Sequence, residues 1–366
     1  MGRKILVICV DGLGPGYLES AATPNLDKMG AEGSFVVGDC VIPSVTNVNN
    51  VSIVTGVTPR KHGLTSNLYF DRSTGEEIRM ESPEFLCWPT LLQRAKGDGL
   101  STALFTAKKK LERLLGRDAN FSLSAEEPDR DMVEKIGPRC DIYSPDINLW
   151  LLRALRLVLR ERDPDVVYCS TTDFMMHRFP PEAEEAISHI ENIDRIVGDI
   201  LDDDPDREIY LTADHGMSAK NRGIDIERLL EAHEVRARAI PIIKDQYVVH
   251  HQNMGGASYV FLDQESDLPE ALAILQDTRG IEEVCTREQA AAQFELMADR
   301  IGDIFVLADK DTVFGTFQAV CEPVGIRSHG SRHEGAVPIL AYGTRGGPAY
   351  HSNYDLVANL GPLRRN

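Results

Sequence analysis

The chain has 366 residues, of which 42% are hydrophobic, so it is long enough for one large α/β domain or for a core with a second lobe. Its formal net charge of −18 disfavours nucleic acid or an anionic membrane surface as a partner. The seven cysteines are odd in number and form no C-x-x-C pair, which argues against a disulfide scaffold and favours a reducing, cytoplasmic setting. The apolar run at residues 4–10 is too short for a signal peptide or a membrane span, so we expect a buried first strand.

Short apolar runs that end abruptly in polar residues predict the strands of a parallel sheet. They lie at residues 4–10, 102–106, 165–169, 208–212 and 337–342. Continuous apolar runs without alternation are typical of strands buried on both faces. Residues 148–161 and 181–201 carry apolar side chains at helical spacing, and Thr23-Pro24 begins a further helix. Alternating strands and helices predict an α/β fold with a doubly wound, mostly parallel sheet flanked by helices.

Two stretches interrupt this alternation and predict an inserted cap. Residues 124–143 are charged and contain proline, and residues 224–320 mix short helices with alternating apolar and polar runs. We interpret both as belonging to a smaller α+β cap. The expected division is a first core segment at 1–110, a small cap segment at 111–145, a second core segment at 146–223, the inserted cap at 224–322 and a third core segment at 323–366.

Polar side chains of metal-ligating types stand just beyond three of the predicted strands. They are Asp11, Asp173, Asp214 and His215. In open α/β sheets, ligands bind beyond the carboxyl ends of the strands. One aspartate in such a place is usually a turn or cap residue, but three together indicate a site. Asp173 and His177 stand four residues apart, so on a helix both face the same way, at a spacing that suits zinc.

Thr46 stands where a capped helix is expected to begin, and Gly56 stands where that helix is expected to end. The structural interpretation of Thr46 is a helix N-cap. A hydroxyl at a helix N-terminus also lies in positive potential, and a neighbouring metal lowers its pKa further. Thr46 is therefore a candidate nucleophile as well as a cap.

The polar motifs occur in an order that resembles a known group of enzymes. They are Asp11-Gly12, Thr46-Asn47-x-Asn49-Asn50, Asp173-x-x-x-His177, Thr212-Ala213-Asp214-His215-Gly216-Met217 and Ser328-His329-Gly330. This set resembles the alkaline phosphatase superfamily, in particular its nucleotide pyrophosphatase/phosphodiesterase branch, which has a threonine nucleophile. Within that branch the chain looks like the phosphonoacetate hydrolases, through residues 46–56, His62-Gly63, Asn67, residues 106–111 and residues 302–307.

The resemblance implies an alkaline phosphatase-like core with two zinc ions per chain. One ion would be held by Asp173, His177 and His329. The other would be held by Asp11, Asp214 and His215, with Thr46 bridging to the metal. Ligand sets of oxygen and nitrogen also admit Mn²⁺ or Fe²⁺. Whether His333 or His351 takes the place of His329 stays open, although by default each of these is a solvated loop histidine.

Lys108 and Lys110 indicate the class of substrate. On an extended segment alternate residues face the same side, so this pair can converge on one anion. Cations beside the carboxylate of phosphonoacetate would stabilise the enolate charge that grows when the C–P bond breaks. The resemblance places Asn67 at a phosphonate oxygen. The alternative is that residues 108–110 are a solvated charge run at the start of a helix.

We therefore expect a metal-dependent hydrolase that cleaves phosphonoacetate to acetate and phosphate. A phosphodiesterase or nucleotide pyrophosphatase with the same site is the alternative, and Phe70, Phe174 or Phe179 would then line an apolar slot. A non-catalytic relative that keeps the fold is a third hypothesis. The expected partner is a small anionic phosphonate rather than a nucleic acid or a membrane, and a homodimer is an open possibility.

Overall fold

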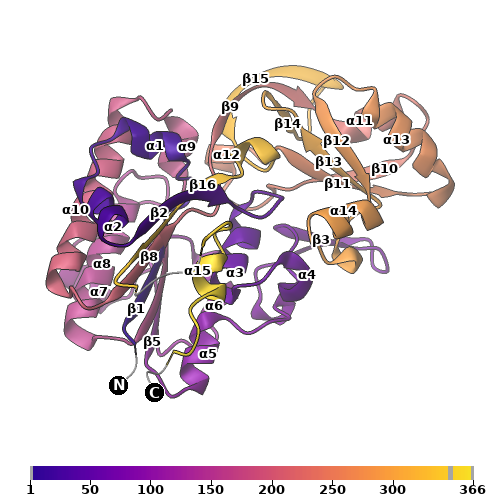
Figure 1. Ribbon diagram of the computed structural model, residues 1–366. Helices are drawn as coiled ribbons and strands as arrows, with labels where there is room; N and C mark the ends of the chain where they lie inside the picture. Colours follow the sequence, from indigo (N-terminus) through magenta and orange to yellow (C-terminus); the bar gives the residue numbers. More distant parts are fainter. Residues whose placement is uncertain (1–2, 345–348, 364–366) are drawn as a thin grey trace.

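The computed structural model describes residues 3–344 and 349–363 and has a seven-stranded central sheet (Figure 1). In spatial order its strands are β2 (Ser34–Asp39), β16 (Ala336–Tyr342), β8 (Glu208–Thr212), β1 (Ile5–Cys9), β7 (Val166–Ser170), β5 (Thr102–Thr106) and β6 (Phe121–Ser124). The five strands from β8 to β6 run parallel, whereas β16 is antiparallel to both of its neighbours. The predicted mostly parallel sheet is therefore confirmed.

The central strands are buried on both faces, as their continuous apolar sequences predict. Every residue of β1, β5, β7 and β8 is buried. Strand β1 lies between β7 and β8, with Ile5 opposite both Val166 and Glu208. The carboxyl ends of these three strands consequently meet at one edge of the sheet, where the site forms.

Helices cover both faces of this sheet, so it is doubly wound (Figure 1). One face carries α1 (Pro15–Ser20), α2 (Pro24–Glu32), α8 (Ile147–Arg162) and α10 (Glu184–Asp203). The other carries α3 (Thr46–Thr55), α5 (Leu91–Gly97), α6 (Lys109–Leu115) and α15 (Asp355–Ala358). Shorter core elements are α4 (Pro59–His62), η1 (Pro83–Phe85), α7 (Arg130–Ile136), α9 (Phe174–Arg178) and η4 (Arg332–Glu334). Within the described ranges no helix is long and apolar enough to cross a membrane.

A second lobe forms the predicted α+β cap. Its antiparallel sheet has the order β10 (Ala237–Pro241), β11 (Ala257–Leu262), β13 (Ile304–Ala308) and β12 (Ile281–Thr286). A second sheet has the order β14 (Thr312–Phe314), β9 (Ser218–Ile224) and β15 (Cys321–Ser328). The remaining elements are α11 (Ile226–Glu231), α12 (Val248–His251), η2 (Glu265–Asp267), α13 (Leu268–Gln276), α14 (Arg287–Gln293), η3 (Ala298–Arg300) and the hairpin β3 (Leu68–Asp71) with β4 (Glu76–Arg79).

Two of the expected boundaries differ from the structure. Residues 111–145 were expected to form a cap segment, but they contain β6, which pairs with β5 at the edge of the core sheet. This prediction was wrong because the sequence of β6, FSLS, has few apolar residues and only half of it is buried. The cap sheets use residues 218–328, slightly more than the predicted 224–322, because β9 and β15 pair with each other. The rest of the division stays a prediction.

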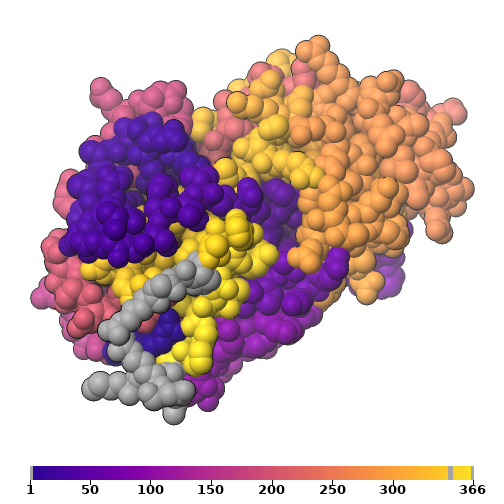
Figure 2. Space-filling model, viewed as in Figure 1, coloured from indigo at the N-terminus to yellow at the C-terminus, as the bar shows by residue number. Residues whose placement is uncertain are grey.

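The cap packs directly on the helix that carries Thr46, and at the surface its orange residues border purple residues of the core (Figure 2). Val45 and Val48, at the start of α3, belong to one apolar cluster with Ile242 and Tyr259 of the cap. The Tyr259 hydroxyl also donates a hydrogen bond to the carbonyl of Thr65, at 2.9 Å. Burial of these side chains fixes the cap over the carboxyl edge of the sheet.

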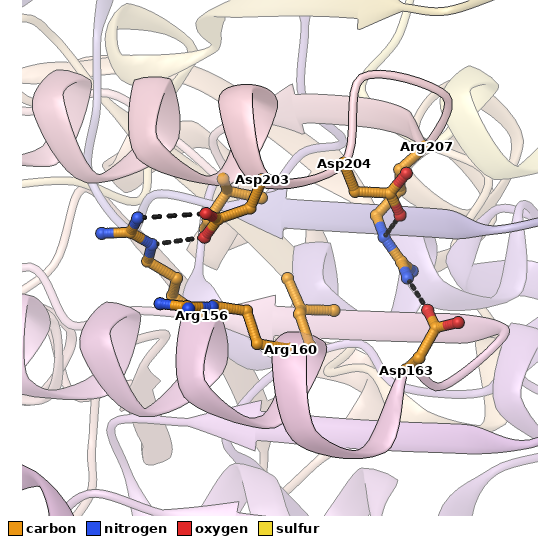
Figure 3. Close-up of a pocket in the computed structure, with 8 residues that line it drawn as sticks. Arg156, Arg160, Asp163, Asp203, Asp204 and Arg207 are labelled. Carbon is orange, nitrogen blue, oxygen red and sulfur yellow. Dashed lines mark hydrogen bonds and ion pairs between the residues drawn. The ribbon is translucent and has the colours of Figure 1, made fainter.

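A charged surface groove of about 530 Å³ lies between α8 and α10, away from that edge (Figure 3). Two of its arginines are paired within the groove: Arg156 with Asp203 at 2.6 Å, and Arg207 with Asp163 at 2.7 Å. Partly exposed ion pairs of this kind contribute at most about 1 kcal/mol each. These two ion pairs therefore link the C-terminal ends of α8 and α10 and the residues that follow them.

One buried ion pair ties the cap strand β9 to the loops around the site. Glu334 accepts hydrogen bonds from Lys220 Nζ at 2.9 Å and from the Ser331 hydroxyl at 2.8 Å. Both charged side chains are fully buried. The carbonyl of Ser331 in turn accepts a hydrogen bond from the Ser44 hydroxyl at 2.7 Å, two residues before Thr46.

Glu334→Gln should destabilise the fold by about 3–5 kcal/mol, because it leaves the buried Lys220 without a counter-charge. Burial opposes ionisation of Glu334, yet Lys220 and the serine hydroxyls lower its pKa below the usual 4.5. The stabilisation is thus complete above pH 4.5 and is lost as the pH falls through the lower folded pKa. Urea unfolding at pH 7 and at pH 4 measures both effects.

Glu231→Gln, at the exposed end of α11, is the control and should change the free energy of unfolding by less than about 0.5 kcal/mol. Equal losses in the two variants at pH 7 would contradict the structural role of Glu334.

Candidate active site

Three aspartates meet at the carboxyl edge of the central sheet, as predicted. Asp11 follows β1, Asp214 follows β8, and Asp173 precedes α9 after β7. They are 0%, 0% and 1% exposed. Because β8, β1 and β7 are neighbours, strand ends that are far apart in the sequence bring these carboxylates together.

These carboxylates repel one another and are removed from water. Burial, with the charges of Asp173 and Asp214, raises the pKa of Asp11 well above its usual range. Burial raises the pKa of Asp214 to about 6. The ammonium of Lys108 lies 2.9 Å from both Asp11 Oδ2 and Asp173 Oδ1. The single positive charge of Lys108 can balance only one of the three carboxylate charges. Further positive charge would therefore stabilise the ionised cluster.

Three histidines present their Nε2 atoms to this cluster. In each, Nδ1 lies within hydrogen-bond distance of a backbone carbonyl oxygen. The distance is 2.7 Å from His177 to the carbonyl of Arg327, 2.9 Å from His215 to that of Gly216, and 2.7 Å from His329 to that of Ser44. A proton on Nδ1 donates to that carbonyl and leaves the Nε2 lone pair free, which is the arrangement of metal-binding histidines. Burial also lowers the pKa of His215 and of His329, so both imidazoles are neutral.

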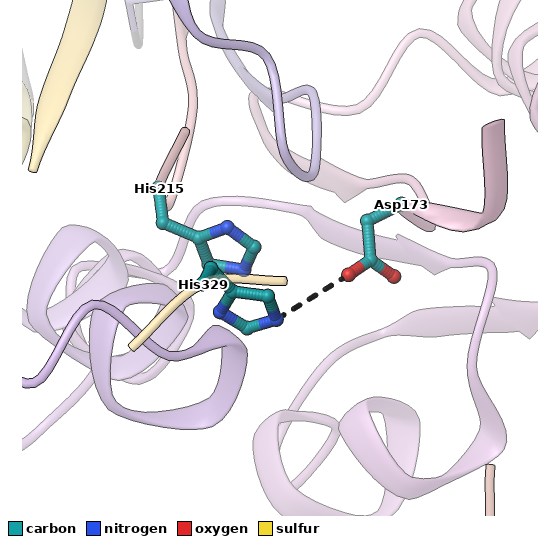
Figure 4. A group of neighbouring side chains, drawn as sticks. All are labelled: Asp173, His215 and His329. Carbon is teal, nitrogen blue, oxygen red and sulfur yellow. Dashed lines mark ion pairs between the residues drawn. The ribbon is translucent and has the colours of Figure 1, made fainter. Parts of the chain in front are cut away.

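Three groups of these side chains bring their ligand atoms within 4.8 Å of one another. They are Asp11, Asp214 and His215; Asp173, His215 and His329 (Figure 4); and Asp173, His177 and His250. Over residues 3–344 and 349–363, Asp11 Oδ1 and His177 Nε2 are buried without a hydrogen-bond partner. His177 Nε2 nevertheless lies 2.9 Å from Asp173 Oδ2, as two ligands of one ion do. The residues present therefore fit divalent metal ions.

The first predicted ligand set, Asp11 with Asp214 and His215, comes together as expected. In the second set, His177 and His329 both approach Asp173 Oδ2, at 2.9 and 3.6 Å. The ring of His329 stacks on that of His215 at 3.5 Å, whereas its centroid lies 5.5 Å from that of His177. His329 thus lies between the two predicted metal positions.

The two competing histidines lie elsewhere. His333 is partly exposed and pairs with Glu282, at 2.6 Å. His351 is exposed, and its backbone N–H bonds Asp355. His329 is the histidine of this region that reaches the carboxylates.

His250 is a site residue that the sequence prediction missed. It belongs to α12 of the cap, and its Nε2 lies 3.6 Å from Asp173 Oδ1. The only signal was the pair His250-His251 in a segment interpreted as cap, and nothing local shows that this segment folds back over the sheet.

Thr46 lies at the first turn of α3, beside the carboxylates. Its hydroxyl is 3.3 Å from His215 Nε2, and the residue is 4% exposed. The N-cap is Val45 rather than the predicted Thr46, so the hydroxyl is not used as a cap. Gly56 ends the helix in the left-handed conformation, as predicted. The hydroxyl therefore faces the cluster from the positive end of a buried helix.

Asn50, one turn further along α3, orients a carboxylate of the cluster. Its Nδ2 donates to Asp214 Oδ2 at 3.0 Å, and its Oδ1 accepts from the Tyr168 hydroxyl at 2.9 Å. The chain of Tyr168, Asn50 and Asp214 holds one candidate metal ligand from behind, as the outer hydrogen bonds of metal sites do.

The predicted substrate residues Lys108, Lys110 and Asn67 are 3%, 2% and 3% exposed. The alternative of a solvated charge run is therefore wrong. The lysines do not lie on an extended segment, since Lys108 is the N-cap of α6 and Lys110 lies within that helix. Lys108 faces Asp11 and Asp173, whereas Lys110 forms an ion pair with Asp245 of the cap.

A buried threonine at a helix N-terminus, beside carboxylates and neutral imidazoles, is an arrangement suited to metal-assisted hydrolysis at phosphorus. Residues 5–330 match the model of the type I phosphodiesterase / nucleotide pyrophosphatase family, so the chain belongs to that family and is a hydrolase of the alkaline phosphatase superfamily.

Among solved structures, the chain is similar to phosphonoacetate hydrolase from Sinorhizobium meliloti 1021 in complex with phosphonoacetate. The two are 33% identical, the match covers 96% of this chain and 94% of that one, and the TM-score is 0.89. Murine ectonucleotide pyrophosphatase / phosphodiesterase 5 shares the fold, with a TM-score of 0.70 at 18% identity over 98% of this chain and 95% of that one.

Among curated proteins, an uncharacterised pyrophosphatase/phosphodiesterase of Schizosaccharomyces pombe is 26% identical over 254 residues. A venom phosphodiesterase of Macrovipera lebetinus is 24% identical over 233 residues. The matches cover 64% and 58% of this chain, but 49% and 25% of those proteins. The chain thus spans half or less of the length of these relatives.

Proposed function

We propose that the chain hydrolyses the C–P bond of phosphonoacetate, giving acetate and phosphate. The observation that carries this proposal is the burial of two lysines at the site: Lys108 contacts Asp11 and Asp173 of the aspartate cluster, and Lys110 contacts Asp245 of the cap. A simple phosphodiester has no second anionic group for such lysines. The similarity to the Sinorhizobium enzyme, solved with phosphonoacetate, supports the same substrate class: a small anionic phosphonate.

The proposed cofactor is a pair of divalent cations, with zinc the best match to the nitrogen and oxygen ligands. Asp11, Asp214 and His215 would hold one ion. Asp173, His177 and His329 would hold the other, with His250 within reach of Asp173. When bound, two such cations supply Lewis-acid stabilisation of the charge that develops during displacement at phosphorus.

The chain itself supplies the nucleophile. Thr46 Oγ1 attacks phosphorus and loses its proton, the C–P bond breaks, and its electron pair leaves on the acetate carbon as an enolate. That carbon takes up a proton to become acetate. Water then attacks the phosphothreonine, which releases phosphate and restores the hydroxyl. The sum is phosphonoacetate plus water giving acetate plus phosphate.

The lysines stabilise the leaving group in this scheme. Negative charge moves from the C–P bond onto the acetate carboxylate as the enolate forms, so a buried ammonium beside that carboxylate binds the transition state more tightly than the substrate. Lys108 also contacts Asp11 and Asp173, so under this proposal it would contact the phosphonate as well as the leaving group.

Thr46→Ala should reduce phosphate release from phosphonoacetate by about 10³-fold or more, because the nucleophile is lost. Thr46→Ser keeps a hydroxyl and should retain measurable turnover. The measurement is phosphate production by the zinc-loaded protein, with circular dichroism to confirm folding. Full turnover in Thr46→Ala would eliminate this residue as the nucleophile.

A second candidate function is hydrolysis of phosphodiesters or nucleotide pyrophosphates with the same site. The family match favours it, and so does a cluster of rings beside Asp173. The ring of Phe174 lies 6.1 Å from that of Tyr143 and 6.3 Å from that of His250. Phe70, by contrast, packs on Phe261 of the cap at 5.0 Å.

Lys110→Ala separates these two functions. Under the proposal it lowers kcat/KM for phosphonoacetate by about 10²-fold, since the charge on the leaving carboxylate is no longer balanced, and it leaves diester turnover nearly unchanged. A panel of phosphonoacetate and bis(p-nitrophenyl) phosphate, assayed on both proteins, measures this. Brisk diester cleavage with no phosphate from phosphonoacetate in the unaltered protein would establish the second function instead.

A further inference from the structure

The candidate site is covered by a segment of the cap. Thr46, Asp11 and Lys110 are at most 4% exposed, so a substrate reaches them only when a cover moves. The cover is the cap segment 244–253, which contains α12. Val248 and Val249 point outward and are 45% and 56% exposed, whereas His250 and His251 of the same turn are buried.

Asp245 is the residue of this segment that contacts the expected substrate-binding groups. Its Oδ2 accepts a hydrogen bond from Asn67 Nδ2 at 3.1 Å and a second one from Lys110 Nζ. These donors are two of the three side chains expected to bind the substrate's anionic groups. A single carboxylate oxygen of the cap therefore occupies the position between them.

The second oxygen, Asp245 Oδ1, is bound within the cap segment. It accepts the backbone N–H of Tyr247 at 2.8 Å and lies 2.9 Å from His251 Nε2. His251 Nδ1 accepts the N–H of Asn253 at 3.0 Å, so its proton is on Nε2 and is donated to Asp245. Burial opposes ionisation, but Lys110 and His251 hold the pKa of Asp245 well below its usual range. The carboxylate is thus charged.

The backbone after α12 is strained, which favours movement of the segment. Gln252 and Asn253 both have positive φ, 52° and 55°, although neither is glycine. Such a conformation costs of order 1 kcal/mol or more for each residue and is retained only where its surroundings impose it. Asn253 is held by hydrogen bonds within the segment: its N–H donates to His251 Nδ1 at 3.0 Å, and its Oδ1 accepts from the Asp245 N–H at 3.1 Å.

We propose that Asp245 is an internal competitor for the carboxylate subsite, displaced by substrates that bind at two points and able to expel the product acetate, which binds at one. This inference rests on the proposed function. Lys110 is buried, so it needs one carboxylate at all times, either that of Asp245 or that of the ligand.

The exchange of Asp245 for a ligand carboxylate at Lys110 depends on how many contacts the ligand makes. A substrate with a phosphonate and a carboxylate is held at the metal-ligand cluster while its carboxylate competes for Lys110. After C–P cleavage acetate keeps only the carboxylate contact. Asp245, tethered to the cap, competes at an effective concentration in the millimolar range and takes the subsite back. Phosphonate esters or diesters without a carboxylate do not compete for Lys110 and leave its ion pair with Asp245 in place.

The test is ligand binding to zinc-loaded Asp245→Asn by calorimetry, which is independent of turnover. The isosteric amide cannot neutralise Lys110, so the Kd values of acetate and of phosphonoacetate should each fall about tenfold. Methylphosphonate lacks a carboxylate and meets Asp245 only at Asn67, so its Kd should fall by less than that of acetate. Asp277→Asn, at the exposed end of α13, is the matched control and should bind as the unaltered protein does.

Unchanged or weaker acetate binding in Asp245→Asn would overturn the proposal, since Asp245 would then merely position Lys110.

If the variant does not fold, hydrogen exchange in the unaltered protein decides. The Tyr247 amide should exchange faster with phosphonoacetate bound, because the segment that holds it leaves the core, and not with methylphosphonate. Unchanged or slower exchange with phosphonoacetate would equally overturn the proposal. The two proposals can also fail separately. If the unaltered protein releases no phosphate from phosphonoacetate but Asp245→Asn binds acetate about tenfold more tightly, the proposed reaction is refuted and the competitor role of Asp245 stands.

Discussion

Three carboxylates buried at the ends of adjacent parallel strands impose the main constraint on this molecule. Removing such charges from water is expensive, and placing them together adds repulsion. The surrounding groups offset part of that cost. The positive N-terminal end of α3 faces the cluster, and the ammonium of Lys108 contacts two of the aspartates. Three imidazoles direct their Nε2 lone pairs toward the cluster. These groups form candidate metal-binding clusters, and the Thr46 hydroxyl lies beside them.

Much of this arrangement was predictable from local rules. Strands buried on both faces have continuous apolar sequences, so the central strands and the aspartates after them could be located, and parallel pairing places those strand ends together. Helix patterns located α8 and α10 to within a few residues. Strand β6 could not be located, because its short polar sequence is stabilised by pairing with β5 rather than by its own pattern.

The contribution of the cap was not predictable in the same way. His250 and Asp245 reach the site only because segment 244–253 folds back over the sheet, and no short-range signal specifies that return. The lysines illustrate the same limit: their importance followed from residue type, but alternation on an extended segment was the wrong geometry. In α6 the two side chains diverge, one to the aspartate cluster and one to the cap. Under the proposed function, Lys110 would therefore link substrate recognition to the position of the cap.

Counting the divalent cations that the aspartate cluster binds tests the proposed two-metal site most directly. The protein is stripped with chelator, reloaded with zinc and desalted, and native mass spectrometry then gives the number of ions per chain. We predict two ions in the unaltered protein and one at most in Asp214→Asn and in His177→Ala. One ion or none in the unaltered protein, or two retained in both variants, would contradict a two-metal site built from these residues.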